Sequence, residues 1–377
     1  MRRAIRTIQG LWLTTRRLPS PYPSLSSLGK KYPQIQADAL ADDIDIDFEK
    51  MSLWSKEQAL AYFESGGADE PPPPPPAPPP AAPLPKPSDD VFKKWFPKWT
   101  PRQGGGCPKF RIVCFHNAGS SENVYTGRGL RATVENPFVL HCRETGGELL
   151  ACELPGREKR RAEPRETQLQ PYCEQLYPVL APFLQEADAL AAAAAGGDAV
   201  PYVIVSHSMG TWFAYEFLKL LAERGIPFPS MWVVSGFPAP HIPERERPWN
   251  RNRPMEDDPD FFNECRQWNV NEIVFDKANW AAFGGMMRDD FTLFDEYTYT
   301  PPPAFLPGGQ FPFPIEARFL TDDKRCREKH LALWGALTSA AFHLEECEGN
   351  HLFFYNNDHR AAWMRNVLGC LPPSFRS

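Results

Sequence analysis

The sequence lacks the cysteine spacing of a metal or redox site. Its nine cysteines, spread over 377 residues, include no C-x-x-C pair and none of the paired spacings of a zinc ribbon. Their density is also far below that of a small disulfide-stapled domain. We therefore interpret them as reduced thiols, and we expect an intracellular protein that uses no metal and no other cofactor.

Long apolar runs are lacking as well. The apolar stretch from Ile8 to Leu13 is far shorter than the roughly 20 residues that cross a bilayer as a helix. The alanine-rich run at 189–195 is followed at once by two glycines and an aspartate. These patterns predict a soluble protein with no membrane span.

An excess of basic charge is missing too. The chain carries 41 Lys and Arg against 47 Asp and Glu, a formal net charge of −6. Binding to nucleic acid is driven largely by neutralisation of phosphates, so this balance argues against a nucleic-acid partner.

Composition divides the N-terminal part into three segments. Residues 1–37 are rich in arginine and contain no acid, which is typical of a mitochondrial or plastid transit peptide; the alternative is a basic tail on a cytoplasmic protein. Residues 38–70 are acidic, and a capping-box spacing after Ser55 predicts one short helix there. Residues 71–105 begin with a dense run of prolines, which predicts an extended polyproline linker or, alternatively, a ligand for an aromatic groove.

From residue 106 to about 372, apolar runs alternate with helical patterns. Such runs are typical of buried parallel strands, and the alternation predicts a doubly wound, mostly parallel α/β sheet with helices on both faces. The gap between Gly236 and Phe313 is too long for a simple crossover, so we expect an inserted helical lid at about 237–312. The expected strands are Phe110–Phe115, Leu149–Leu154, Tyr202–Val205, Met231–Val234, Ile315–Leu320 and Phe342–Cys347, and the expected helices are Leu169–Ala195, Met209–Arg224, Arg327–Ala341 and Asp358–Leu371.

Ser208 lies where a strand runs directly into a helix, within the sequence Ser206-His207-Ser208-Met209-Gly210. A serine at such a sharp turn needs small neighbours two residues away on either side, and this segment supplies them. The pattern is that of the nucleophile elbow of the α/β-hydrolase fold. We expect Ser208 to be a nucleophile.

A serine hydroxyl needs a base and an orienting carboxylate, which in this fold follow it in the order Ser, Asp or Glu, His. His351 lies in a turn after the last expected strand and is the preferred base over His330, His343 and His359, which fall within expected helices or strands. The acid is expected just after the strand Ile315–Leu320, where Asp322 and Asp323 are both available.

The oxyanion that forms during such a reaction needs two backbone N–H donors. We expect one from Met209, at the start of the helix after the nucleophile, where the helix dipole favours an anion. The second is expected from Ala118, in the loop Phe115–Ser121 after the first core strand.

Taken with the elbow, three further segments resemble the type II thioesterases of polyketide, nonribosomal-peptide and fatty-acid synthesis. Leu154-Pro155-Gly156-Arg157 is similar to the LPGR loop of that family, and Arg288–Tyr299 is similar to its R-A-D-F…E-Y-x-Y stretch. Asp323-Lys324-Arg325 followed by Trp334 is similar to its acid loop and next helix, which favours Asp323 over Asp322. The resemblance covers about residues 108–371.

The resemblance implies an α/β-hydrolase with Ser208, Asp323 and His351 as its triad and Met209 and Ala118 as its oxyanion donors. It implies hydrolysis of acyl thioesters carried on the phosphopantetheine arm of an acyl carrier protein, by a monomer. An oxygen-ester esterase or lipase would use the same residues, and a non-catalytic binding module could use the same scaffold. Ser206 departs from the family pattern, which has glycine there.

Two further groups of residues bear on substrate and partner. The basic loop Arg157–Arg161 is a possible contact for an acidic carrier, although solvated charge in a loop is the more common explanation. In the expected lid, six apolar side chains are available to line an acyl pocket or to pack within the lid: Trp280, Phe283, Met286, Met287, Phe291 and Phe294.

Overall fold

The computed structural model describes residues 75–100, 106–128, 135–187, 199–252, 255 and 258–376. The expected transit peptide and the acidic segment with its short helix lie outside these residues. The chain divides into two compact units. The main unit comprises Pro78–Thr300, Phe313–Trp334 and Ala341–Ser377; in the other unit, Phe311 forms an isolated parallel bridge with Thr338.

The main unit is built on a six-stranded sheet in the order β2-β1-β3-β4-β5-β6, and every neighbouring pair is parallel. This confirms the predicted fold class and the position of each predicted strand. The chain starts at β1, one strand in from the edge, adds β2 at that edge, and then crosses back to place β3 on the other side of β1 and to add β4, β5 and β6 in turn. The strands are β1 (Arg111–Phe115), β2 (Glu148–Ala151), β3 (Tyr202–His207), β4 (Met231–Ser235), β5 (Ile315–Leu320) and β6 (Phe342–Cys347).

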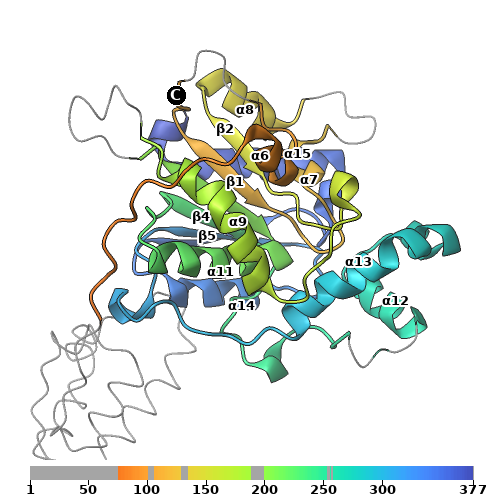
Figure 1. The fold of residues 1–377 in the computed structure, drawn as a ribbon. Coiled ribbons are helices and arrows are strands. Elements are labelled where there is room, and N and C mark those ends of the chain that lie inside the picture. Colours follow the sequence, from red (N-terminus) through yellow and green to blue (C-terminus); the bar gives the residue numbers. More distant parts are fainter. Residues whose placement is uncertain are drawn as a thin grey trace, which may run out of the picture. The chain divides into compact units, whose positions relative to one another are not determined.

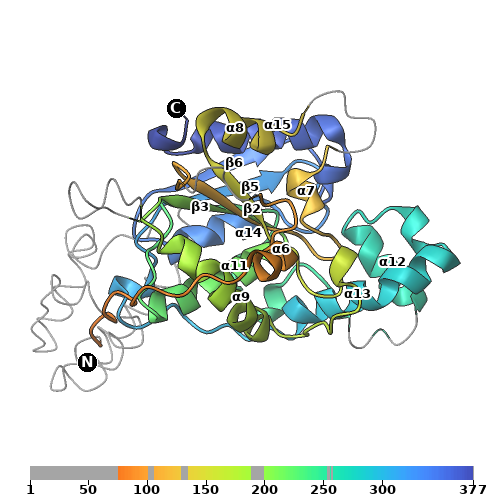
Figure 2. The ribbon, with the colours of Figure 1, turned by 45° about the horizontal axis from the view of Figure 1, so that its top comes forward.

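Helices cover both faces of the sheet. Figure 2 shows α8 and α15 together on one side of the strands and α9 with α11 on the other, and Figure 1 agrees. The main-unit helices are α6 (Asp89–Trp95), α7 (Asn123–Thr126), α8 (Pro137–Thr145), α9 (Leu169–Leu184), α11 (Met209–Glu223), α12 (Asp258–Gln267), α13 (Lys277–Asp295), α14 (Glu328–Leu331) and α15 (Asn357–Cys370).

The central strands are apolar on both faces because both faces are covered. All side chains of β1, β3 and β4 are buried. On the side of α9 and α11, the ring of Phe115 packs against Phe213, with centroids 5.0 Å apart. On the opposite side, Val203 belongs to the same hydrophobic cluster as Trp363 of α15. These two layers fix the sheet and therefore the edge at which its strands end.

Two predicted helices differ from the observed ones. The helix that begins at Leu169 ends at Leu184, whereas the sequence predicts it to continue to 195. Its C-cap residue, Gln185, donates from its side chain to the carbonyl of Ala81. The stretch predicted as one helix from Arg327 to Ala341 forms only the short α14, followed by a 3₁₀ segment, Ala332–Leu337. Trp334 is fully buried there and donates from Nε1 to the carbonyl of Phe237, 2.8 Å away, so tertiary packing outweighs local helix propensity.

A polyproline segment, residues 78–88, lies against the main unit within the stretch that composition assigns to a linker. Every third position in it, at 78, 81, 84 and 87, is half-buried, while the residues between them are exposed. This is the period of a polyproline II helix, which has three residues per turn. The side chain of Gln185 donates to the carbonyl of Ala81 and accepts from the N–H of Leu84, at 3.0 and 3.2 Å.

Helix α6 follows this segment and is also part of the folded body. Ser88 caps it, accepting from the N–H of Val91, and two aspartates begin its first turn. Phe92 is fully buried and its ring stacks on Phe183 of α9, with centroids 4.1 Å apart. Trp95 stacks beneath the guanidinium of Arg160, whose Cζ lies 4.1 Å from the ring centroid. The folded body therefore starts well before the first strand.

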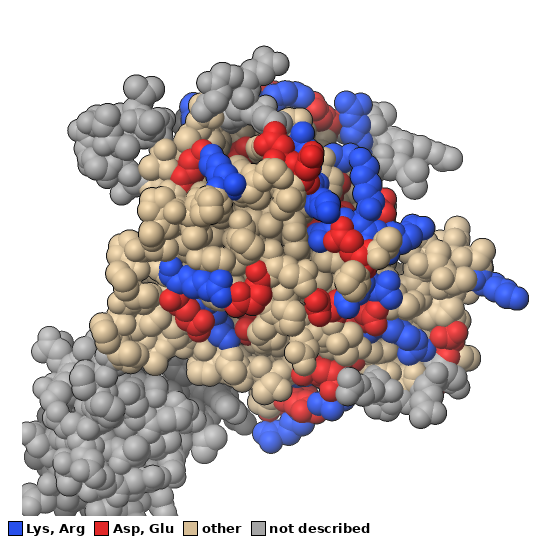
Figure 3. Space-filling model, in the orientation of Figure 1, with Lys and Arg blue, Asp and Glu red and all other residues tan. Residues whose placement is uncertain are grey.

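The lid consists mainly of α12 and α13, inserted between β4 and β5, as expected. Aromatic rings hold the two helices together: Phe261 of α12 packs edge-on against Phe291 of α13, with centroids 5.1 Å apart. Within the described residues, no helix is both long enough and apolar enough to cross a membrane. None of the nine cysteines, all of which fall within the described residues, forms a disulfide. On the face drawn in Figure 3, acidic and basic side chains are intermingled.

Candidate functional site

Ser208 lies at the tip of the turn between β3 and α11. Its backbone has φ 54° and ψ −133°, a strained conformation that non-glycine residues seldom adopt. A hydrogen bond from its N–H to the carbonyl of Ser235, at 2.9 Å, holds the turn against the end of β4. The turn therefore presents the Ser208 side chain at the carboxyl edge of the sheet, which is where ligands bind in open α/β sheets.

The small residues around Ser208 allow this turn to form. A Cβ at Gly210 would lie 2.6 Å from the carbonyl oxygen of His116, so only glycine lets the start of α11 approach the loop after β1 this closely. Gly236 has φ 61°, and a Cβ there would lie 2.5 Å from the Cε1 of His207. Both glycines are required by close packing around the elbow.

Ser206, which departs from the family pattern, has a structural role in the sheet. Its hydroxyl donates to the carbonyl of Val233 at 3.1 Å and accepts from the Nε1 of Trp232 at 2.8 Å. The side chain is fully buried and both of its bonds run to β4. The serine therefore satisfies the indole of a buried tryptophan, and it does not face the site.

Ser208, His351 and Asp323 form one chain of hydrogen bonds. The Oγ of Ser208 lies 2.8 Å from the Nε2 of His351, and the Nδ1 of His351 lies 2.7 Å from the Oδ2 of Asp323. Because an ionised carboxylate can only accept, Nδ1 carries a hydrogen and the Nε2 of a neutral ring is free to accept the serine proton. The three side chains are 4%, 2% and 0% exposed, so the chain is shielded from water.

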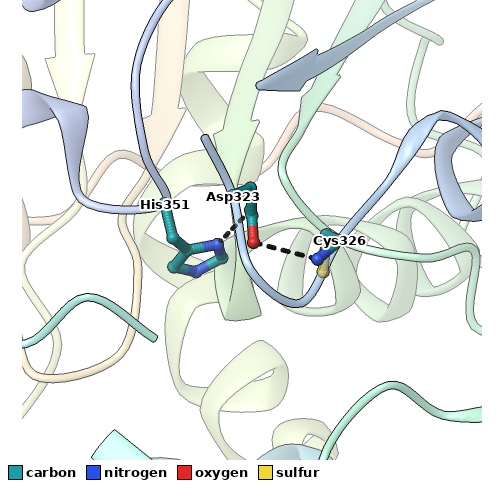
Figure 4. Close-up of side chains that lie close together, drawn as sticks. All are labelled: Asp323, Cys326 and His351. Atoms are coloured by element: carbon teal, nitrogen blue, oxygen red, sulfur yellow. Dashed lines mark hydrogen bonds and ion pairs between the residues drawn. The ribbon is translucent and has the colours of Figure 1, made fainter. Parts of the chain in front are cut away.

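Backbone donors orient the carboxylate of Asp323. Its Oδ1 accepts from the N–H of Arg325 at 2.8 Å and from that of Cys326 at 2.9 Å, which leaves Oδ2 for the imidazole (Figure 4). Burial alone would raise the pKa of Asp323, but His351 and the two N–H donors hold that pKa below its ordinary value. Asp322, by contrast, is exposed, and the structure brings only Asp323 to the histidine.

Asp323, Cys326 and His351 also offer donor atoms that lie within 4.8 Å of one another, an arrangement that could in principle bind a metal (Figure 4). Their chemistry does not suit that role. Burial, and then the charge of Asp323, raises the pKa of the Cys326 thiol well above its ordinary value, whereas a metal needs the thiolate. The Nδ1 of His351 is already bonded to Asp323. The cluster therefore fits the support of a histidine base better than metal binding.

The two expected oxyanion donors flank the elbow. Met209 is the first residue of α11, where N–H groups have no partner within the helix. Ala118 lies in the loop after β1, against which Gly210 lets the helix pack. Within the described residues the N–H of Ala118 makes no hydrogen bond, whereas its carbonyl accepts from the side chain of Asn117 at 3.0 Å.

A buried ion pair holds the loop that contains Ala118. Arg157 and Asp290 pair with side chains that are each 1% exposed. Arg157 also donates to the carbonyl of Ser120 at 2.7 Å, and Asp290 accepts from the N–H of Gly119 at 2.7 Å. The LPGR-like loop and the lid helix α13 therefore fix the loop from both sides.

His207 is a residue of the site to which the sequence assigns no role. Its ring is fully buried, and its Nε2 donates to the carbonyl of His351 at 2.8 Å. Burial, and then the charge of His351, lowers the pKa of His207 to about 3, so the ring is neutral at working pH. This hydrogen bond links His207, the residue before Ser208, to the main chain of His351. Its position in the elbow was the only signal in the sequence.

The other histidines lie outside this chain of hydrogen bonds. His330 is buried in α14, where its Nδ1 accepts from the N–H of Arg327 at 3.0 Å and closes a capping box. His343 pairs with Glu316 on the neighbouring strand, with its Nδ1 2.6 Å from the carboxylate. His359 lies in α15.

The basic loop Arg157–Arg161 and the six apolar lid side chains both contain buried and exposed members. In the loop, Arg157 and Arg160 are buried in structural contacts, and Arg161 is exposed. Most of the six apolar lid side chains are buried against one another or against the core; Phe283 is 39% exposed. Met287 lies against the loop next to Ala118, since its Cγ would be 3.4 Å from a Cβ at Gly119.

A cavity of about 350 Å³ opens beside the loop that contains Ala118. Four segments that are distant in the sequence line it: this loop, the LPGR-like loop, α13 and the segment after His351. Its lining includes Gly119, Arg161, Phe283, Met286, Tyr355 and Arg360. The cavity therefore combines apolar walls with cationic groups, one residue away from a predicted oxyanion donor.

The chain is similar to known proteins in both sequence and structure. The gramicidin S biosynthesis protein GrsT of Aneurinibacillus migulanus is 26% identical over 212 residues, which cover 56% of this chain and 73% of that protein. Thioesterase PikA5 of Streptomyces venezuelae is 26% identical over 251 residues, which cover 66% and 76% of the two chains. The structure of the type II thioesterase BorB from the borrelidin biosynthetic cluster has the same fold, with a TM-score of 0.55, 22% identity and coverage of 77% of this chain and all of that one.

The profile of one protein family matches most of the folded body. It is described as the thioesterase domain, and it covers residues 110–369, from the residue before β1 to the end of α15. That range contains the elbow, the loop after β1, the lid and the Ser–His–Asp chain of hydrogen bonds. The chain belongs to the thioesterase family.

Proposed function

We propose that this thioesterase hydrolyses acyl groups carried on the phosphopantetheine arm of an acyl carrier protein, with Ser208 as nucleophile, His351 as base and Asp323 as the orienting acid. One observation supports this above all: a strained, buried serine lies 2.8 Å from an imidazole whose other nitrogen is bonded to a buried carboxylate. The names of the relatives support a role in a biosynthetic pathway: one is a gramicidin S biosynthesis protein, and another is a type II thioesterase from the borrelidin biosynthetic cluster.

The reaction proceeds in two halves. Ser208 attacks the thioester carbonyl while its proton passes to the Nε2 of His351, and the N–H groups of Met209 and Ala118 stabilise the oxyanion. The thiol of the arm then leaves with that proton, and the acyl group remains as an ester on Ser208. Water, deprotonated by the same imidazole, releases the free acid and restores the serine.

The cavity of about 350 Å³ is the route that we propose for the arm. Its lining includes Gly119, the residue after one expected oxyanion donor, together with Phe283 and Met286 of the lid. Arg161 lines it and is exposed, in a position to meet a phosphate or the acidic surface of a carrier. Arg160, an expected carrier contact from the sequence, is 5% exposed and stacked on Trp95, so Arg161 is the basic residue of this loop that is both exposed and part of the cavity lining.

Intact-mass spectrometry tests the proposal directly. A carrier protein loaded with a series of acyl groups should lose the acyl mass when incubated with the enzyme, and Ser208→Ala should not catalyse that loss. Matched oxygen esters should turn over more slowly than thioesters; the reverse order would favour an esterase. A fluorophosphonate probe should label Ser208, and a folded protein that resists the probe would indicate a binding module instead.

Charge reversal at the cavity tests the route. Arg161→Glu should raise KM for an acyl-carrier substrate several-fold and leave kcat unchanged, because it removes a cation from the path of an anionic arm. Lys159→Glu is the matched control, since Lys159 is exposed on the same loop and does not line the cavity. Equal effects from the two changes would show that general charge, and not this cavity, matters.

A further inference from the structure

Both main-chain polar groups of His351 are bonded to side chains. Its carbonyl accepts from His207, on the central strand β3. Its N–H donates to the Oδ1 of Asn269, at 3.3 Å, and Asn269 belongs to the lid, just after α12. The histidine that meets Ser208 is therefore held from one side by the sheet and from the other by the lid.

The lid also packs against the imidazole itself. The ring of Trp268 meets that of His351 edge to face, with centroids 4.6 Å apart and planes at 66°. Trp268 is 4% exposed, and its Nε1 donates to Glu264 at 3.1 Å. The lid residue Trp268 therefore packs against the imidazole of His351 and restricts its rotation.

The same lid segment reaches the carboxylate through an ion pair. Glu264 is 3% exposed and pairs with the guanidinium of Arg325. The N–H of Arg325 is one of the two donors that orient Asp323. The segment from Glu264 to Asn269 therefore contacts the histidine directly and the acid through one residue.

The backbone at Asn269 is bent to make this contact. Its φ is 63°, in the left-handed region that few residues other than glycine occupy. Asparagine and aspartate tolerate that region best among residues with a side chain, and glycine there would lack the oxygen that His351 uses. The position combines an unusual conformation with the one acceptor for the His351 N–H.

We propose that the lid segment Glu264–Asn269 is a positioning element that holds His351 within hydrogen-bonding distance of Ser208, so that the serine is reactive only while this segment lies against the histidine. The inference rests on the proposed function in that it takes Ser208 and His351 to be nucleophile and base. Asn269 and Trp268 are positioning residues, because they act through the histidine and contact no reacting atom. A lid displaced by an incoming acyl chain would leave His351 held only by His207 and Asp323.

The test compares full-length variants by the rate at which a fluorophosphonate labels Ser208 between pH 5 and pH 9. This probe needs the serine and its base but no carrier or thioester. Asn269→Gly keeps the backbone conformation and removes the oxygen, so labelling should slow by about tenfold, the effect of one lost hydrogen bond. Asn271→Gly is the matched control on the same lid, since Asn271 contacts no part of the histidine and caps only a short 3₁₀ segment.

Asn269→Asp gives a second, independent result. It keeps the acceptor and tolerates the same φ, so the labelling rate at its best pH should return to within about threefold of the unmodified enzyme. A residue that only stabilised the fold would give the same labelling rate in folded Asn269→Gly and folded Asn269→Asp, whereas a positioning residue gives a rate that recovers with the acceptor.

The outcomes separate this inference from the proposed function. Unchanged labelling in Asn269→Gly, or labelling in Asn269→Asp as slow as in Asn269→Gly, overturns the positioning role. If Asn269→Gly is too unstable to assay, Asn269→Ala, which also removes the oxygen, is compared with Asn269→Asp in its place. If the unmodified protein is labelled but fails to hydrolyse acyl carriers, the proposed substrate is wrong, and the comparison of labelling rates still decides whether the lid positions the histidine.

Discussion

Replacing Asp323 by asparagine should inactivate the enzyme by reversing the hydrogen-bond direction at the histidine. Two backbone N–H groups, of Arg325 and Cys326, point at one carboxylate oxygen. The single oxygen of asparagine is expected to stay with those two donors, which turns its NH₂ group toward the Nδ1 of His351. The ring must then accept at Nδ1 and carry its hydrogen on Nε2, where it can no longer take a proton from Ser208.

The expected loss in kcat is about 10⁴-fold, the size that a wrong tautomer causes in serine hydrolases, or about 5.4 kcal/mol of transition-state free energy. The assay is acyl-carrier hydrolysis by mass spectrometry alongside fluorophosphonate labelling of Ser208. Asp322→Asn is the matched control, because Asp322 is the exposed neighbour and should retain full activity. The thermal midpoint of both variants should stay close to that of the unmodified protein, since the amide fits the same space. Activity of Asp323→Asn within tenfold of the unmodified enzyme would refute the assigned hydrogen-bond direction.

Four further changes test other parts of the structure. Gly210→Ala should lower the free energy of unfolding by about 2–3 kcal/mol in chemical denaturation, because its Cβ would meet backbone rather than a movable side chain; an unchanged midpoint would contradict the close packing. Asp290→Ala should cost about 3–5 kcal/mol, because Arg157 is left buried without its partner, and an effect below 1 kcal/mol would argue that the pair is open to water. His207→Leu should slow fluorophosphonate labelling of Ser208 at least tenfold, because it removes the hydrogen bond to the carbonyl of His351, whereas His207→Gln keeps a donor and should not. Equal labelling rates in the two variants would show that this hydrogen bond does not contribute to the reactivity of Ser208. Burial, and then the charge of Arg157, lowers the pKa of His116 to about 3, so the folded state does not take up the proton that the unfolded state binds near pH 6.5, and the free energy of unfolding falls as pH drops. His116→Gln should remove about 2 kcal/mol of this loss between pH 8 and pH 5. Parallel curves of stability against pH for the two proteins would contradict the lowered pKa of His116.

The strands and the order of the functional residues were predictable because each rests on a local pattern. Buried parallel strands are continuous apolar runs, so all six strands were located from hydrophobicity alone. Ser208 stood out because a strand, small residues and a helix follow one another without a break. His351 stood out because it comes just after the last strand. In each case the signal lies within about ten residues of the position predicted.

The remaining features depend on contacts between distant segments. The choice between Asp322 and Asp323 needed the family resemblance, because the loop after β5 has no period and its shape is set by backbone hydrogen bonds. His207 and Asn269 meet His351 across 144 and 82 residues of sequence, which no local pattern encodes. Helix α6 lies in the stretch for which composition predicts a linker: its cap and its charged first turn are visible in the sequence, but the prolines before it predict an extended chain.

The placement of α6 has a practical consequence for anyone who prepares this protein. The family profile begins at residue 110, yet Phe92, Trp95 and Phe96 are at most 5% exposed in the folded body. A protein shortened to the family boundary would uncover the aromatic surface of α9 on which these rings rest, and would invite aggregation. Expression designs should therefore begin no later than Pro78, because the main folded unit starts there, more than thirty residues before the family match begins at residue 110.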